Sequence, residues 1–221
     1  SIMAQLPYDT VKDLAGVTLI STLPIALFAT PSLPVNNVAE LVAYAKKNPK
    51  TLSYGSARLG STSHLAGLML NQLAGVDLVH VPYKGSAPAQ QDLIGGRLTL
   101  LFDSFISQLP MVQAGRVKLV APAGPRRLPG FPDAAPIGDT VKGFNVESYF
   151  GVIAPRATPP AVLAQIHQAI KKAMEDPAVS SWMATQGMVP AASTPAQFDA
   201  FIQADMKKWA AVVKSLGGKI A

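Results

Sequence analysis

The 221-residue sequence contains no cysteine, which excludes disulfide bonds, thiolate metal sites and thiol nucleophiles. Charged residues are scarce at 14%, whereas hydrophobic residues make up 49%, and this balance excludes a disordered chain. The net charge is +6, but lysine and arginine are scattered and form no basic block with interleaved aromatic residues. The composition therefore predicts one large domain or two small lobes, and we expect no nucleic-acid partner.

An uncharged stretch from Leu14 to Ala39 is long enough to cross a bilayer, but it lacks the continuity of a membrane helix. Pro24, Pro31 and Pro34 interrupt it, which favours buried strands joined by turns. The chain does not open with a basic segment followed by an apolar core, so we expect no signal peptide within it. That expectation leaves secretion open.

The hydrophobic pattern between residues 15 and 121 alternates between strand and helix. Short apolar runs bounded by turns predict strands, and apolar residues three or four positions apart predict helices. The expected strands are Val17–Ile20, Ile25–Phe28, Leu52–Tyr54, Val76–Val81, Leu98–Phe102 and Val117–Ala121, and the expected helices start at Asn37, after Gly60, at Ser86 and at Ser104. This alternation predicts an α/β fold with a mostly parallel sheet.

The second half of the chain changes character. Prolines and glycines between residues 122 and 143 predict an irregular surface connection, and Ser148–Ala154 predicts a strand. Helices are expected from there to the end, because Thr158, Asp176 and Thr194 each place a capping residue before a proline. The last helix carries an apolar stripe that needs a partner surface, formed by Phe198, Phe201, Ile202, Trp209, Val212, Val213 and Leu216.

Sequence signatures of common enzymes are missing from the chain. It has no G-x-S-x-G elbow, P-loop, G-x-G-x-x-G loop or H-E-x-x-H pair. Its histidines, His64, His80 and His167, are dispersed; without cysteine they predict no metal site, and the last two fit structural roles. A serine hydrolase that uses Ser61 or Ser63 with His64 stays an alternative. Neighbours on a helix point about 100° apart, however, and are poorly placed for proton transfer.

The segment from Tyr54 to His64 has the composition of an anion-binding loop. A strand enters a glycine-containing turn, and the turn opens a helix whose first residues carry hydroxyl groups. The first N–H groups of a helix are unpaired and partly positive, so this segment predicts a cradle for a carboxylate or phosphate. A plain Ser/Thr cap on a glycine-rich turn is the alternative. The candidate ligand-binding residues are Tyr54, Ser56, Gly60, Ser61, Thr62, Ser63 and His64.

Two later strands are followed by further candidate residues. After the strand that ends at Val81, Tyr83 would wall a pocket, Lys84 would supply a counter-charge and Gly85 precedes a helix. Lys84 is alternatively a solvated loop lysine. Asp103 ends the next strand, and either caps the following helix or accepts a hydrogen bond from a ligand. Because ligands collect at the carboxyl ends of strands in open α/β sheets, we expect one shared pocket.

Several stretches of the sequence resemble a known family. They are Tyr8–Asp13, Pro31–Pro34, Tyr54–Ser56, Ser63–Gly67, Ala74–Asp77, Val79–Pro88, Phe102–Asp103 and Tyr149–Gly151. In this order they resemble the extracytoplasmic solute receptors of tripartite tricarboxylate transporters, also called Bug receptors. The resemblance runs over essentially the whole chain.

The resemblance implies a two-lobed, type II-like periplasmic binding protein. It would capture a small carboxylate or dicarboxylate for a membrane permease, and it implies neither a cofactor nor catalysis. It also adds Tyr149 and Phe150 to the expected ligand contacts. A ligand-sensing lobe of a regulatory protein stays an alternative function.

The same resemblance predicts how the chain divides. Residues 24–146 correspond to one complete α/β lobe, and residues 1–23 and 147–221 to parts of the other, represented mainly by its C-terminal helices. The N-terminal third of that family's chain would precede Ser1. Because strands from that third are expected to cover the stripe of the last helix, we expect either a longer polypeptide or an oligomer.

Overall fold

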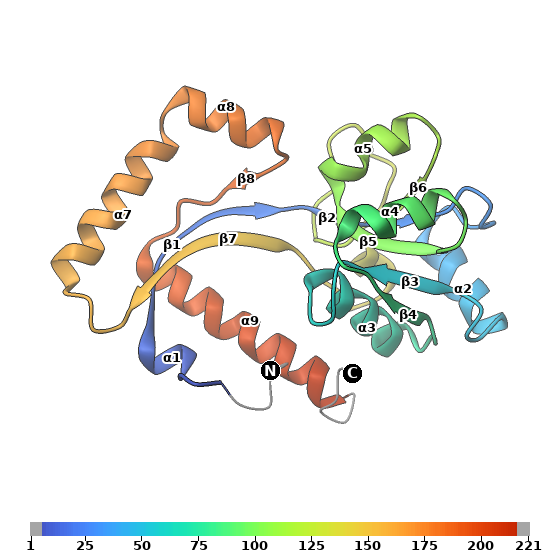
Figure 1. Ribbon diagram of the computed structural model, residues 1–221, viewed down its shortest axis with the longest axis horizontal. Coiled ribbons are helices and arrows are strands. Elements are labelled where there is room, and N and C mark those ends of the chain that lie inside the picture. Colours follow the sequence, from blue (N-terminus) through green and yellow to red (C-terminus); the bar gives the residue numbers. More distant parts are fainter. Residues whose placement is uncertain (1–5, 216–221) are drawn as a thin grey trace. The chain divides into compact units, whose positions relative to one another are not determined.

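The computed structural model describes residues 6–215, which separate into two compact units. Residues 6–23 and 148–215 form unit 1, and residues 24–147 form unit 2 (Figure 1). That these units act as the two lobes of a binding protein stays a prediction.

Unit 2 is built on a five-stranded sheet with the order β4-β3-β5-β2-β6. Its strands are β2 (Ile25–Ala29), β3 (Ser53–Ser56), β4 (Val79–Pro82), β5 (Leu100–Ser104) and β6 (Lys118–Pro122). β3 is parallel to β4 and β5, whereas β2 is antiparallel to β5 and β6. The predicted mostly parallel sheet is therefore confirmed, since of these five strands only β2 runs against the others. β2 enters the sheet directly from unit 1 without a crossover helix.

Helices cover both faces of this sheet (Figure 1). α4 (Ser86–Ile94) and α5 (Phe105–Gln113) pack on one face, in a cluster that includes Phe28, Leu93 and Leu101. α3 (Thr62–Ala74) lies on the opposite face, where Gly67 allows the helix to approach the buried ring of Tyr54. The unit is completed by α2 (Val38–Lys47) and by the short α6 (Ile137–Thr140), a helix inside the connection expected to be irregular.

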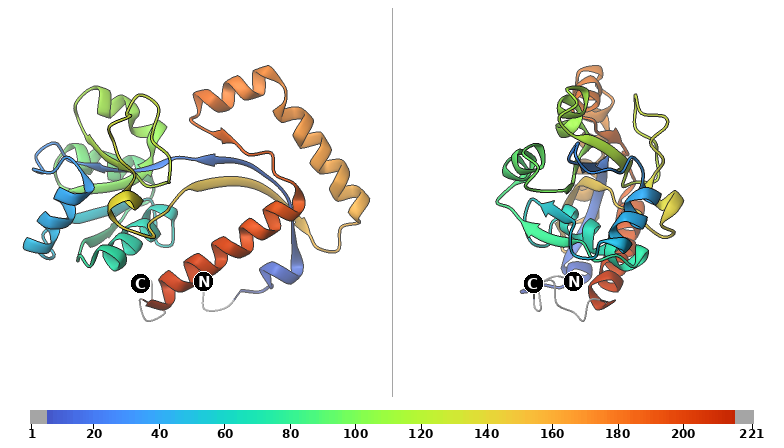
Figure 2. Two further views of the ribbon diagram at one scale, coloured as in Figure 1. Left: turned by 180° about the vertical axis from the view of Figure 1, so that it is seen from behind. Right: turned by 90° about the vertical axis from the view of Figure 1, so that its right-hand side faces the viewer.

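Unit 1 contains a three-stranded antiparallel sheet with the order β7-β1-β8. Its elements are α1 (Thr10–Asp13), β1 (Leu14–Leu23), β7 (Ser148–Pro155), α7 (Pro160–Met174), α8 (Pro177–Thr185), β8 (Val189–Pro190) and α9 (Pro195–Ser215). α9 packs against β1, and the left view of Figure 2 shows the N-terminal end of α9 beside the strands of this sheet. Within residues 6–215, no helix has both the length and the apolar character needed to cross a bilayer.

The chain's own strands cover the N-terminal end of the apolar stripe on α9, at Phe198. Phe198 is only 2% exposed. Its ring packs so closely on the strands that a Cβ atom added to Gly151 would lie 2.2 Å from it, and a Cβ atom added to Gly16 would lie 3.0 Å from it. Because these two glycines have no side chains, they leave room on β1 and β7 for the ring. Val212 and Val213 are also buried, Phe201, Ile202 and Trp209 are half-buried, and Leu216 lies outside the described residues. The expectation that this stripe needs strands preceding Ser1 is therefore wrong for Phe198.

Candidate functional site

The carboxyl ends of β4, β3 and β5 are neighbours, because β3 pairs in parallel with both other strands. Each strand leads into a helix, α4, α3 and α5 respectively. The first two loops are joined by backbone hydrogen bonds: Tyr83 N–H donates to Ser56 O at 2.9 Å, and Gly85 N–H donates to Ala57 O at 2.8 Å. The structure therefore brings the predicted residues of unit 2 to one edge of the sheet.

Hydroxyl groups hold the loop between β3 and α3 together. Ser61 caps α3, since its Oγ accepts from His64 N–H at 3.4 Å and donates to Arg58 O at 2.7 Å. Ser63 is 9% exposed; its Oγ accepts from Ala57 N–H at 3.2 Å and lies 2.9 Å from Ser61 Oγ. The plain cap is thus present at Ser61, and the Ser63 hydroxyl is turned into the loop. Thr62, between them, is half-buried.

Buried side chains support this loop from beneath. Ser56 is fully buried, and its Oγ donates to Arg58 O at 3.1 Å and bonds to His80 Nε2 at 2.7 Å. The His64 and His80 rings are stacked with centroids 3.9 Å apart, and His64 Nδ1 accepts from Gly60 N–H at 3.0 Å. These contacts position the loop; Ser56 and His64 are buried, and His80 is half-buried.

The buried cluster carries no charge near pH 7. Burial lowers the pKa of His64, and burial together with the neighbouring His64 ring lowers the pKa of His80 to about 4. Burial also raises the pKa of Tyr54, whose hydroxyl donates to His64 O at 3.4 Å. These three rings therefore add no negative charge beneath the loop that would oppose an anion.

The outer surface of the two joined loops is positive. The side chains of Arg58 and Lys84 are exposed, and neither forms an ion pair with a carboxylate of residues 6–215. No side chain caps the N-terminus of α4 or of α5. A Cβ atom added to Gly85 would have no neighbouring atom within 4 Å, so the space beside this residue is unfilled. Uncapped N–H groups beside two unpaired cations attract an anion. Sequence reasoning missed Arg58, although a cation between Gly55 and Gly60 of an anion-binding loop is a usable signal.

Asp103 and Tyr83 are held by side chains of unit 2. Asp103 accepts from Ser86 Oγ at 3.0 Å and from Gln108 Nε2 at 2.7 Å, so it ties α4 to α5 and does not cap the backbone of α5. The Tyr83 hydroxyl donates to Asp92 Oδ2 at 2.9 Å. Burial and this bond raise the pKa of Tyr83 to about 12. Whether Asp103 also accepts from a ligand stays a prediction.

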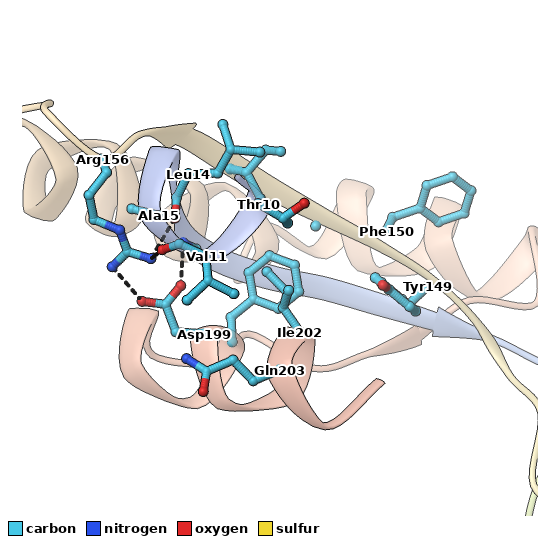
Figure 3. A pocket seen from close by; sticks show the side chains of 14 residues that line it. Thr10, Val11, Leu14, Ala15, Tyr149, Phe150, Arg156, Asp199, Ile202 and Gln203 are labelled. Carbon is cyan, nitrogen blue, oxygen red and sulfur yellow. Dashed lines mark hydrogen bonds and ion pairs between the residues drawn. The ribbon is translucent and has the colours of Figure 1, made fainter. Parts of the chain in front are cut away.

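Tyr149 and Phe150 lie in unit 1, on β7, where they line a cavity of about 360 Å³ bounded by α1, β1, β7 and α9 (Figure 3). The cation in its wall, Arg156, already pairs with Asp199 at 3.3 Å and donates to backbone carbonyls. Asp199 also accepts from Gly16 N–H at 2.7 Å. Because these polar groups satisfy one another, the cavity offers mainly apolar surface and is a poor carboxylate cradle.

The serine–histidine arrangements do not form an accessible nucleophile. Ser63 bonds to Ala57 N–H and Ser61, not to the His64 ring, and in the Ser56–His80 pair the serine is fully buried and the histidine half-buried. A serine nucleophile needs access to substrate as well as a base. The described part of the chain also contains no cluster of three or more His, Asp or Glu side chains that could hold a metal ion.

Comparisons with known proteins agree on one family. A family model described as the tripartite tricarboxylate transporter family receptor matches residues 1–218. The chain is 33% identical over 207 residues to a UPF0065 protein of Pseudomonas sp. (strain P51), covering 93% of this chain and 62% of that protein. It is 32% identical over 221 residues to a UPF0065 protein of Agrobacterium vitis, covering 98% of this chain and 64% of the relative. The chain thus spans less than two thirds of the length of these curated relatives.

Solved structures show the same fold. The structure "R. palustris Rpa4515 with adipate" is 31% identical with a TM-score of 0.84, covering 98% of this chain and 73% of that one. The periplasmic binding protein BugD is 30% identical with a TM-score of 0.83, covering 98% and 74%. MatC of Rhodopseudomonas palustris with bound malate is 28% identical with a TM-score of 0.80, covering 96% and 74%. The α/β architecture is therefore that of a periplasmic binding protein.

Proposed function

The chain belongs to the tripartite tricarboxylate transporter receptor family, and from this premise we propose that it binds a small carboxylate or dicarboxylate in the periplasm. The family and the fold are those of solute-binding receptors rather than enzymes. Two of the solved relatives hold adipate and malate, which supports a carboxylate as the ligand class. In this proposal the bound solute is delivered to the membrane permease of a tripartite transporter.

The observation that carries the proposal is the positive surface formed by the β3–α3 and β4–α4 loops. Arg58 and Lys84 flank the two residues, Ala57 and Gly85, whose backbone bond joins these loops. The uncapped start of α4 adds N–H groups at the same place. Charge-assisted hydrogen bonds to a carboxylate are about twice as strong as neutral ones, so such a surface selects an anion.

The predicted ligand-binding residues of unit 2 fall into two roles in this proposal. Gly60, Ser61, Thr62, Lys84 and Gly85 are partly or fully exposed and would contact the carboxylate. The buried side chains position the loop for those contacts; they are Tyr54, Ser56, Ser63 and His64. Tyr83, Asp103, Tyr149 and Phe150 stay predicted contacts, and Asp103 would select ligands that carry a hydroxyl or amino group.

Isothermal titration calorimetry with acetate, malate, adipate and citrate tests the proposal. We expect at least one of these carboxylates to bind, and Lys84→Gln and Arg58→Gln each to weaken binding by about 0.5–1 kcal/mol or more. Lys47→Gln is the matched control, because Lys47 is an exposed lysine at the far end of α2 in the same unit. If no carboxylate binds, or if Lys47→Gln weakens binding as much as Lys84→Gln does, the proposal is wrong.

A further inference from the structure

The Gly60–His64 hydrogen bond fixes the protonation state of the His64 ring. Gly60 N–H donates to His64 Nδ1 at 3.0 Å, so this nitrogen carries no proton when the loop is in the described conformation. Gly60 has a φ of +73° and immediately precedes Ser61, the cap of α3. The bond therefore anchors the tightest turn of the loop to the first turn of the helix.

The second ring of the pair has a different bonding pattern. The single proton of the Ser56 hydroxyl is used in the bond to Arg58 O, so Ser56 Oγ accepts from His80 Nε2–H. A proton added to His80 would enter at Nδ1 and break neither of these bonds. A proton added to His64 Nδ1 would remove the acceptor of Gly60 N–H and place two N–H groups against each other.

The described groups around the pair supply no carboxylate to a positive ring. From β3, Tyr54 lies with its ring centroid 5.0 Å from that of His80 and donates to the His64 carbonyl. From the loop, Arg58 presents its carbonyl to Ser56 and has an exposed cationic side chain. From β4, His80 stacks on His64 at 3.9 Å, and a charge on either ring opposes a charge on the other. No carboxylate of residues 6–215 bonds to either ring.

We propose that His64 is a positioning residue for carboxylate binding, whose neutral ring holds Gly60 in place and whose protonation opens the loop. The proposal rests on the proposed function, because its consequence for the protein is weaker carboxylate binding in acid. Below the His64 pKa the binding-competent fraction falls by up to about tenfold per pH unit, and the apparent affinity falls with it.

The first test uses the protein without any added carboxylate, so its result does not depend on the proposed function. Nitrogen-15 NMR of the imidazoles reports which ring nitrogen carries the proton, and the chain has only three histidines to assign. We expect His64 Nδ1 to be unprotonated at pH 7.5, and the Gly60 amide signal to shift with the His64 ring during acid titration. A protonated Nδ1 at pH 7.5, or a Gly60 amide that ignores the titration of His64, would overturn the proposal.

The second test compares binding in wild type and in His64→Asn. Asparagine keeps an oxygen acceptor near the position of Nδ1 but cannot titrate, so His64→Asn should bind malate or adipate with a shallower pH profile. His64→Leu removes the acceptor and should bind more weakly than His64→Asn throughout. His167→Asn, in unit 1, is the matched control and should keep the wild-type profile. The ligand's own protonation is common to all variants and cancels in their ratio.

The outcomes separate the two proposals. A ratio of His64→Asn to wild-type affinity that rises several-fold between pH 7.5 and pH 5 supports the positioning role. A ratio that stays constant down to a pH below the His64 pKa measured in the first test overturns it. If neither malate nor adipate binds at any pH, the proposed function fails for these ligands, and the Gly60 amide titration still decides the role of His64.

Discussion

The hydroxyl of Ser63 shows how one side chain can hold a loop together from its inner side. Its Oγ satisfies the Ala57 N–H and is almost inaccessible. We predict that Ser63→Ala lowers the free energy of unfolding by about 1 kcal/mol, because the half-buried Ala57 N–H loses its acceptor. Thr62→Ala, the next position, should change it by no more than about 0.5 kcal/mol. Equal effects in urea denaturation would show that Ser63 has no special structural role.

The histidine pair also predicts how stability depends on pH. The pKa of His80 is lowered in the folded state from 6.5 to about 4, so the unfolded chain takes up a proton first as the pH falls. This contribution to stability is complete above pH 6.5 and is lost as the pH falls from 6.5 towards about 4. Urea midpoints measured across this range should fall, and His80→Asn should flatten the slope. An unchanged slope in His80→Asn would contradict this prediction.

The sequence predicts which residues form the candidate site better than it predicts where their side chains point. Two glycines and a run of hydroxyl residues predict an anion-binding loop, but spacing alone does not show that Ser63 turns inward while Thr62 stays partly exposed. The stacking of His64 on His80 depends on the parallel register of β3 and β4, which is a non-local pairing. A single sequence does not reveal such a contact.

Local signals locate many helix starts and few strand partners. Asn37 accepts from Glu40 N–H and caps α2, and Asp176 accepts from Ala178 N–H and caps α8, as their sequence positions predict. The direction of β2 and the presence of the two-residue β8 were not predicted, because both depend on pairing with distant strands. Periodicity is a local property, whereas strand direction is set by the whole sheet.

The contact between α9 and the sheet of unit 1 can be tested at the element scale. Gly151→Ala places a methyl group where the Phe198 ring lies, and we predict a loss of about 1–3 kcal/mol of unfolding free energy. Adding Phe198→Leu should recover part of this loss, because the smaller side chain frees the space. Thermal or urea unfolding of the four proteins in this cycle measures the coupling. Strict additivity of the two changes would contradict the described contact.

At the level of the whole molecule, the family assignment, the α/β architecture and the loops at the edge of the unit 2 sheet support the proposed carboxylate binding. The resemblance read from the sequence is confirmed by the family match over residues 1–218 and by the solved receptors. The amino-acid composition mainly excluded disulfide bonds, thiolate sites and a disordered chain. The order of strand, loop and helix predicted which loops form the candidate site. The expectation of either a longer polypeptide or an oligomer stays a prediction.

The most direct test of the central claim is a nitrogen-15 NMR titration of the protein with malate and adipate. The account predicts that the largest amide shifts occur at Gly60 and at Ser86 and Ala87, which begin the uncapped helix α4. Saturable shifts at these positions would place the carboxylate on the joined loops. Saturable shifts confined to Gly16 and Gly151, in the wall of the unit 1 cavity, would contradict the account.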